Sequence, residues 1–136
     1  MLDPNNRVIM VSGANRGIGL ATAKLLISSG YKVSLGSRNP GDIPISCLSG
    51  KIIKCHWDAK IKNTSKEWVK ETISEFKKLD GVIMNAGVEL GGDLDGDTEE
   101  EFDEMFEVNF KGPLRLVRET LPELKKSGSG RIINVV

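Results

Sequence analysis

A chain of 136 residues is long enough for one domain with its own hydrophobic core, because a chain of this size buries roughly 68% of its unfolded surface. Its 19 basic residues balance its 19 acidic residues, so the chain lacks the excess of positive charge that is typical of proteins that bind nucleic acid or anionic membranes. We therefore expect neither as a partner. The first residues lack the features of a secretion signal, and no apolar run approaches the length of a membrane span, so we expect a soluble, cytoplasmic protein. Cys47 and Cys55 lack the spacing of a metal or redox motif, so we expect ordinary thiols and no metal site.

Five short segments rich in β-branched residues alternate with segments of helical character. They span residues 7–11, 32–36, 51–55, 81–85 and 131–136. Apolar runs separated by helices are typical of βαβ units, in which right-handed crossovers cover both faces of a parallel sheet. The sequence therefore predicts an α/β fold with a Rossmann-like, doubly wound parallel sheet, formed by residues 1–136 as a single domain.

The first two helices are predicted at about residues 18–29, where Gly30 is a natural C-cap, and at about residues 64–78. One apolar stripe at helical spacing should turn the second helix toward the core. It consists of Trp68, Val69, Thr72, Ile73 and Phe76. Residues 37–51 contain two prolines where a helix would normally stand, so we expect an irregular loop or a single turn there.

The third helix should open at Thr98, which can form a capping box with Glu101, and continue toward Leu124. It carries more apolar surface than one sheet face requires, from Phe102, Met105, Phe106, Leu114, Leu116 and Val117. The acids between Asp93 and Glu104 partly match a calcium loop. However, the glycine stands at the fourth position instead of the sixth, and an acidic first helical turn explains the pattern.

A glycine-rich segment, VSGANRGIG at residues 11–19, follows the first strand and opens the first helix. An anion at a helix N-terminus meets unpaired backbone N–H groups and the positive end of the helix dipole, and glycine lets the chain approach it closely. The glycine spacing is GxxxGxG rather than the GxGxxG of the commoner dinucleotide fold, and a simple tight turn is the alternative interpretation. We expect a site for the pyrophosphate of a dinucleotide, formed by Gly13, Asn15, Arg16, Gly17, Ile18 and Gly19.

The residues after the second strand favour NADP over NAD. An acid about 20 residues beyond the glycine loop is typical of NAD sites, whereas a nearby arginine is typical of NADP sites. Here Ser37 and Arg38 end the strand, and no acid follows until Asp42. Ser37 and Arg38 can bind a phosphate, and Arg16 can approach from the other side. The alternative is that both arginines are ordinary surface charges.

Four motifs, in order along the chain, resemble those of the short-chain dehydrogenase/reductase family. They are SGANRGIG (12–19), MNAGV (84–88), EVNFKG (107–112) and GRIINVV (130–136). The resemblance implies an enzyme that transfers a hydride between a nicotinamide cofactor and a small carbonyl or alcohol substrate. It also implies that Asp58, followed by Ala59, binds the adenine, and that the cofactor cleft is lined by Asn85, Ala86 and Gly87.

The family's catalytic set is Asn, Ser, Tyr and Lys, and here the resemblance extends only to Asn109, which would hold a water in the proton relay. The one tyrosine, Tyr31, lacks the lysine of a YxxxK pattern. In the family, the strand that matches RIINVV leads into the catalytic serine and then the YxxxK helix. We therefore expect a fragment that ends after the fifth strand, leaves that strand as an exposed edge, and is inactive alone.

The local sequence also points to Asn109. Pro113 stands four residues later and, lacking an N–H, cannot donate to the Asn109 carbonyl as a helix requires. The helix should bend there and leave that carbonyl free for a water. Alternatively, Pro113 merely ends one helix and begins another.

A function from another class stays open: a dinucleotide-binding module that senses or scaffolds without catalysis. The residues after Val136 would discriminate between the two, because a serine followed by YxxxK indicates an enzyme. In the family the third helix commonly packs against a second copy, so we expect a homo-oligomer of the full-length protein.

Overall fold

The computed structural model describes residues 3–91, 96 and 98–136, so part of the acidic stretch from Asp93 to Glu104 lies outside the described residues. The strands are β1 (Val8–Ser12), β2 (Lys32–Ser37), β3 (Ile52–His56), β4 (Gly81–Met84) and β5 (Arg131–Asn134). The helices are α1 (Gly17–Ser28), α2 (Lys62–Phe76), α3 (Glu99–Phe106) and α4 (Gly112–Lys126). A 3₁₀ turn at Pro40–Asp42 is the single turn expected between β2 and β3, and a π-helical turn at Glu107–Lys111 joins α3 to α4.

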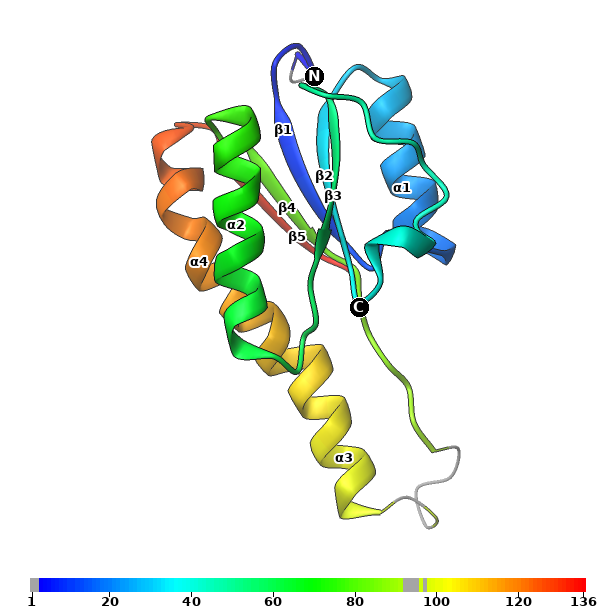
Figure 1. Ribbon diagram of the computed structural model, residues 1–136. Coiled ribbons are helices and arrows are strands. Elements are labelled where there is room, and N and C mark those ends of the chain that lie inside the picture. Colours follow the sequence, from blue (N-terminus) through cyan, green and yellow to red (C-terminus); the bar gives the residue numbers. More distant parts are fainter. Residues whose placement is uncertain (1–2, 92–95, 97) are drawn as a thin grey trace.

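The sheet is parallel throughout, in the order β3-β2-β1-β4-β5. Helix α1 covers one face, and α2 and α4 cover the other (Figure 1). The chain winds outward from β1 to β3 and then returns to the other side of β1 for β4 and β5, which is the predicted doubly wound topology. Because the strand order reverses between β1 and β4, the loops at the carboxyl ends of these strands diverge and leave a crevice.

Side chains of β1 alternate between two cores, as period-2 strand geometry requires. Val8 and Met10 pack in the core beneath α2 and α4, whereas Val11 packs on the α1 side. Four members of the predicted α2 stripe are buried and Ile73 is half-buried, which confirms that this face meets the sheet. Trp68 at its centre is fully buried, and its Nε1 donates to Ser34 Oγ at 2.8 Å.

Both predicted helix-terminal signals are present. Gly30 has a φ of +93° just after α1, a conformation that disfavours other residues. Thr98 Oγ1 accepts from the Glu101 N–H at 3.2 Å, and the Glu101 carboxylate accepts from the Thr98 N–H at 2.9 Å. The capping box is therefore confirmed.

The predicted bend near Asn109 takes the form of the π-helical turn at Glu107–Lys111. A wider turn accommodates Pro113, which has no N–H for the carbonyl four residues earlier. The prediction that this helical segment carries surplus apolar surface was wrong for Leu116, which is fully buried in the chain's own core and is not available to a partner. Phe102, Phe106 and Leu114 are exposed.

Strand β5 is the edge of the sheet, and all four of its residues are exposed, as expected for a strand with only one neighbour. No helix in the described part of the chain is long and apolar enough to cross a membrane.

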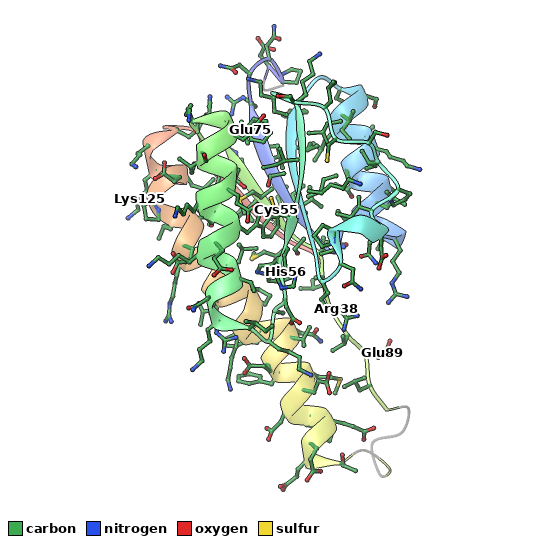
Figure 2. All side chains as sticks on the ribbon, in the orientation of Figure 1. Arg38, Cys55, His56, Glu75, Glu89 and Lys125 are labelled. Atoms are coloured by element: carbon green, nitrogen blue, oxygen red, sulfur yellow. The ribbon has the colours of Figure 1, made fainter. Side chains whose placement is uncertain are left out.

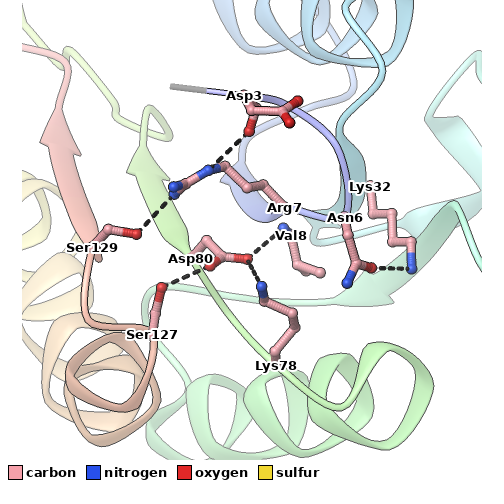
Figure 3. A network of polar contacts seen from close by, with 9 residues as sticks. All are labelled: Asp3, Asn6, Arg7, Val8, Lys32, Lys78, Asp80, Ser127 and Ser129. Atoms are coloured by element: carbon pink, nitrogen blue, oxygen red, sulfur yellow. Dashed lines mark hydrogen bonds and ion pairs between the residues drawn. The ribbon is translucent and has the colours of Figure 1, made fainter. Parts of the chain in front are cut away.

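A polar network ties together the amino ends of β1, β4 and β5 (Figure 3). The Asp80 carboxylate, only 3% exposed, accepts from the Val8 N–H at 2.9 Å and from Ser127 Oγ at 2.6 Å, and it lies 3.2 Å from Lys78 Nζ. Burial raises the pKa of Asp80, but the bonds from Ser127, Val8 and Lys78 outweigh it and hold this pKa below its ordinary value. The carboxylate thus stays ionised inside the protein.

Candidate functional site

A cavity of about 470 Å³ opens at the carboxyl ends of the strands, where the topology predicts a crevice. Twelve of the fourteen residues predicted for the site line it. They are Gly13, Asn15, Arg16, Gly17, Ile18, Ser37, Arg38, Asp58, Ala59, Asn85, Ala86 and Gly87. Gly19 and Asn109 do not line the cavity. Gly19 contacts the glycine loop and Asn109 contacts the loop after β4, and both of these loops do line it.

The glycine loop is tied to the end of β2. The Gly13 and Ala14 N–H groups donate to the Gly36 carbonyl at 2.9 and 3.3 Å. Gly13 has a φ of +67°, which favours glycine, and a Cβ there would lie 3.0 Å from Ala86 Cα. At Gly19 a Cβ would lie 2.2 Å from the Gly13 carbonyl oxygen, so this glycine lets α1 approach the loop.

The N-terminus of α1 opens toward the cavity without a side-chain cap. Arg16 is the N-cap, its side chain makes no capping bond, and the first turn contains no acid. The first N–H groups of a helix have no partner inside the helix, and the dipole favours an anion beside them. This end of the cavity is therefore suited to a phosphate or pyrophosphate.

Ser37 and Arg38 form the wall beside β2. Ser37 is 6% exposed, and among the described residues its Oγ is the buried side-chain polar atom left without a hydrogen-bond partner. Arg38 is exposed next to it, and Figure 2 shows it at the carboxyl end of the sheet near His56. His56 Nδ1 lies 2.8 Å from the Arg38 carbonyl and donates to it, so the backbone here is anchored to β3. The Ser37 hydroxyl and the Arg38 guanidinium make no side-chain hydrogen bond within the described residues, and together they fit an anionic ligand group.

Asp58 and Ala59 form another wall, in the loop between β3 and α2. Asp58 Oδ1 accepts from the Lys60 N–H at 2.9 Å, and the Asp58 N–H donates to Thr64 Oγ1 at 3.2 Å. These local bonds fix the turn, and within the described part of the chain Oδ2 of Asp58 accepts no hydrogen bond. Such a carboxylate oxygen can accept from an exocyclic amino group.

Asn85, Ala86 and Gly87 continue from β4 over the cavity. The hydroxyl of Ser12, at the end of β1, accepts from the N–H groups of Asn85 and Ala86 at 2.9 and 3.1 Å. Ser12 is fully buried, so it joins the carboxyl ends of β1 and β4 beneath the cavity floor. This supporting residue was missed from the sequence, where one small polar residue at a strand end carries no signal.

Asn109 pairs with a backbone segment rather than with the cavity. Its Oδ1 accepts from the Val88 N–H at 2.9 Å, and its Nδ2 donates to the Val88 carbonyl at 2.8 Å. A Cβ at Gly87 would lie 3.3 Å from Asn109 Oδ1, so the contact is tight. The π-helical turn thus holds the loop after β4 in place.

Sequence reasoning also missed several residues that line the cavity. They are Asn39, Asp42, Trp57, Lys60, Val88, Glu104 and Val108. Glu104 and Val108 come from α3 and the π-helical turn, and no local pattern relates them to the residues around Asp58. Only Asp42 had a signal, as the first acid after β2.

Tyr31 lies away from this cavity. Tyr31 precedes β2, so it stands at the amino edge of the parallel sheet, whereas the cavity is at the carboxyl edge. The chain's one phenol is therefore not in a position to exchange a proton with a ligand in this cavity.

Comparison with known proteins identifies the chain's relatives. A family model described as short chain dehydrogenase matches residues 7–136. The agropine synthesis reductase of Rhizobium rhizogenes is 36% identical over 134 residues, which cover 94% of this chain and 30% of that protein. The chain spans between 30% and 60% of the length of the curated relatives it matches.

Solved structures give the same result. An alcohol dehydrogenase from the archaeon Thermococcus sibiricus, complexed with 5-hydroxy-NADP, is 31% identical with a TM-score of 0.85, and the match covers 94% of this chain and 57% of that one. A short chain dehydrogenase/reductase from Burkholderia phymatum, in complex with NAD, shares the fold at 23% identity and a TM-score of 0.87, over 98% of this chain and 50% of that one. Because the family model matches nearly the whole chain, the protein belongs to the short-chain dehydrogenase/reductase family.

Proposed function

We propose that these residues form the dinucleotide-binding domain of an oxidoreductase that transfers a hydride between NADP and a small carbonyl or alcohol substrate. The observation that carries the choice of NADP is the unpaired Ser37 hydroxyl, buried in the cavity wall beside Arg38. A 2′-phosphate would accept from this hydroxyl and from the guanidinium, which removes the cost of burying an unpaired donor. The T. sibiricus relative, whose structure holds an NADP derivative, adds support.

Each loop around the cavity has a role in this proposal. The N–H groups at the start of α1 bind the pyrophosphate, Asp58 accepts from the adenine amino group, and residues 85–87 line the nicotinamide end. The bound nicotinamide supplies or takes up the hydride. Asn109 holds the loop after β4 against the π-helical turn, so the cleft keeps its shape when the cofactor enters.

Catalysis needs a proton donor or acceptor in addition to the hydride carrier. The family uses a tyrosine with a lysine nearby, and residues 1–136 contain no YxxxK pattern. We therefore propose that residues 1–136 bind the cofactor without turning over substrate.

Arg38→Asp tests the cofactor preference. We expect NADPH affinity to fall on the order of 10- to 100-fold, because a lost charge-assisted hydrogen bond costs about 1.5–3 kcal/mol, and NADH affinity to change much less. Lys24→Asp is the matched control, since Lys24 is an exposed cation on α1 that does not line the cavity, and this variant should keep both affinities. Titration of each variant with NADPH and NADH gives the ratio of the two dissociation constants. Equal affinity of the unchanged protein for both cofactors would contradict the proposal.

We also propose that the aromatic side of α3 and the π-helical turn contacts a second copy of the chain. Phe102, Phe106 and Phe110 are 45%, 52% and 55% exposed. The rings of Phe106 and Phe110 stack at 4.8 Å between centroids. Three aromatic side chains one turn apart form an apolar stripe of the kind that a symmetric, self-complementary contact covers.

The double variant Phe106→Glu/Phe110→Glu is expected to shift the protein to a smaller species, since two charges would have to be buried in the contact. Leu25→Glu on α1 is the control, because Leu25 is 67% exposed on the other side of the sheet. Sedimentation velocity at micromolar concentration measures the change. An unchanged protein that is already monomeric would rule the contact out.

A further inference from the structure

The loop that carries Asp58 rests directly on the helix that follows the cavity. A Cβ at Gly112, the first residue of α4, would lie 2.5 Å from Ala59 Cβ and 3.0 Å from Ala59 Cα. Only a residue without a side chain permits so close an approach. The backbone at Ala59 is therefore seated on α4.

Two side chains, Arg115 of α4 and Glu104 of α3, hold the same loop. Arg115 Nη1, one turn beyond Gly112, donates to the Ala59 carbonyl at 3.0 Å. Lys60 Nζ lies 2.9 Å from Glu104 Oε1, but both side chains are about half exposed, so solvent weakens this pair. Arg115 is 20% exposed and is the stronger anchor of the two.

Arg115 is itself held in place by Glu107. The Glu107 carboxylate accepts from Arg115 Nη2 at 2.5 Å and lies 3.2 Å from Lys111 Nζ. These two cations, Arg115 first, lower the pKa of Glu107, so the carboxylate stays charged at neutral pH. A planar guanidinium can bond a carboxylate and a carbonyl at once, which an ammonium cannot do with the same geometry.

The anchored loop is a wall of the cavity. Asp58, Ala59 and Lys60 line it on one side, with Glu104 beside them. Asp58 bonds the Lys60 N–H at 2.9 Å, so the turn moves as one unit with Ala59. A displacement of Ala59 would therefore displace the Asp58 carboxylate.

We propose that Arg115 is a positioning residue for the adenine end of the cofactor, acting through the Ala59 carbonyl to hold the Asp58 turn in the cavity wall. The role rests on the proposed function, because it assumes that a dinucleotide lies in the cavity. If Arg115 served only to pair with Glu107 and stabilise the helix, it would not also donate to the Ala59 carbonyl, 56 positions earlier in the chain.

Arg115→Met tests this role, with Arg118→Met as the matched control, since Arg118 is exposed on the same helix. The probes are NADPH and its hypoxanthine analogue, which has a carbonyl in place of the adenine amino group. For Arg115→Met we expect NADPH affinity to fall about tenfold and the preference for NADPH over the analogue to shrink toward one. Arg118→Met should keep both values. Glu107→Gln should give a smaller change in the same direction, and the double variant with Arg115→Met should be no worse than Arg115→Met alone.

The two proposals fail in distinguishable ways. If the unchanged protein binds neither NADPH nor NADH, the proposed cofactor site is wrong and this role falls with it. If Arg115→Met binds NADPH and the analogue as Arg118→Met does, only the role of Arg115 is overturned. A loss of affinity with an unchanged preference between the two probes would also overturn it, because a general loss of stability would weaken both equally.

Discussion

Gly19→Ala is expected to abolish nucleotide binding and to lower the free energy of unfolding by about 1–3 kcal/mol. The new Cβ would lie 2.2 Å from the Gly13 carbonyl oxygen and 2.5 Å from Asn85 Nδ2. The first of these is a backbone atom of the loop that lines the cavity, so relief requires the loop itself to move. The gain of up to about 1 kcal/mol that alanine brings to a helix does not offset this overlap.

Gly41→Ala is the control, because no described residue outside its own turn has an atom within 4 Å of a Cβ at that position, and its backbone does not require glycine. Urea unfolding and NADPH titration of both variants measure the two effects. A Gly19→Ala protein that unfolds and binds like the unchanged protein would mean that α1 does not approach the loop as closely as described.

Asp80→Ala is expected to lower the free energy of unfolding by about 2–4 kcal/mol. It removes the acceptor for the buried Val8 N–H and for Ser127 Oγ and leaves Lys78 without its partner (Figure 3). Glu123→Ala is the control, because the pair of Glu123 with Lys126 is at the surface and contributes at most about 1 kcal/mol. Equal losses from the two variants would contradict a structural role for the buried carboxylate.

Asp80 should also make stability depend on pH. Its pKa is lowered in the folded protein, so its contribution is complete above the unfolded value of about 4 and is lost as the pH falls through the lower folded value. Asp80→Asn has no charge to lose. The difference in unfolding free energy between the unchanged protein and Asp80→Asn should therefore shrink as the pH is lowered from about 5 to about 2. A difference that stays constant over this range would mean that Asp80 has an ordinary pKa.

Features that depend on neighbours in the chain could be predicted from the sequence. The five strands lie within one or two residues of their predicted places, because β-branched runs and the intervening glycines act locally. The Thr98 capping box joins residues three apart, and the stripe around Trp68 follows helical spacing. The glycine loop and the Ser37–Arg38 pair could be placed as well, because each directly follows a predicted strand, and loops after parallel strands meet at one edge of the sheet.

Only the tertiary structure decided the contacts between residues that are far apart in the chain. Asn109 meets Val88 across 21 positions, Arg115 meets Ala59 across 56, and Asp80 meets Val8 across 72. No periodicity or turn propensity relates the members of such a pair, because their meeting depends on strand order and on how close two helices approach the sheet. Leu116 is an example: it was predicted, together with exposed Leu114, to belong to the helix's surplus apolar surface, and only the packing of α4 showed that it faces the chain's own core. The sequence by itself thus determined the fold class and twelve of the residues that line the cavity, while the packing of α3 and α4 against the sheet decided which side chains hold those residues in place.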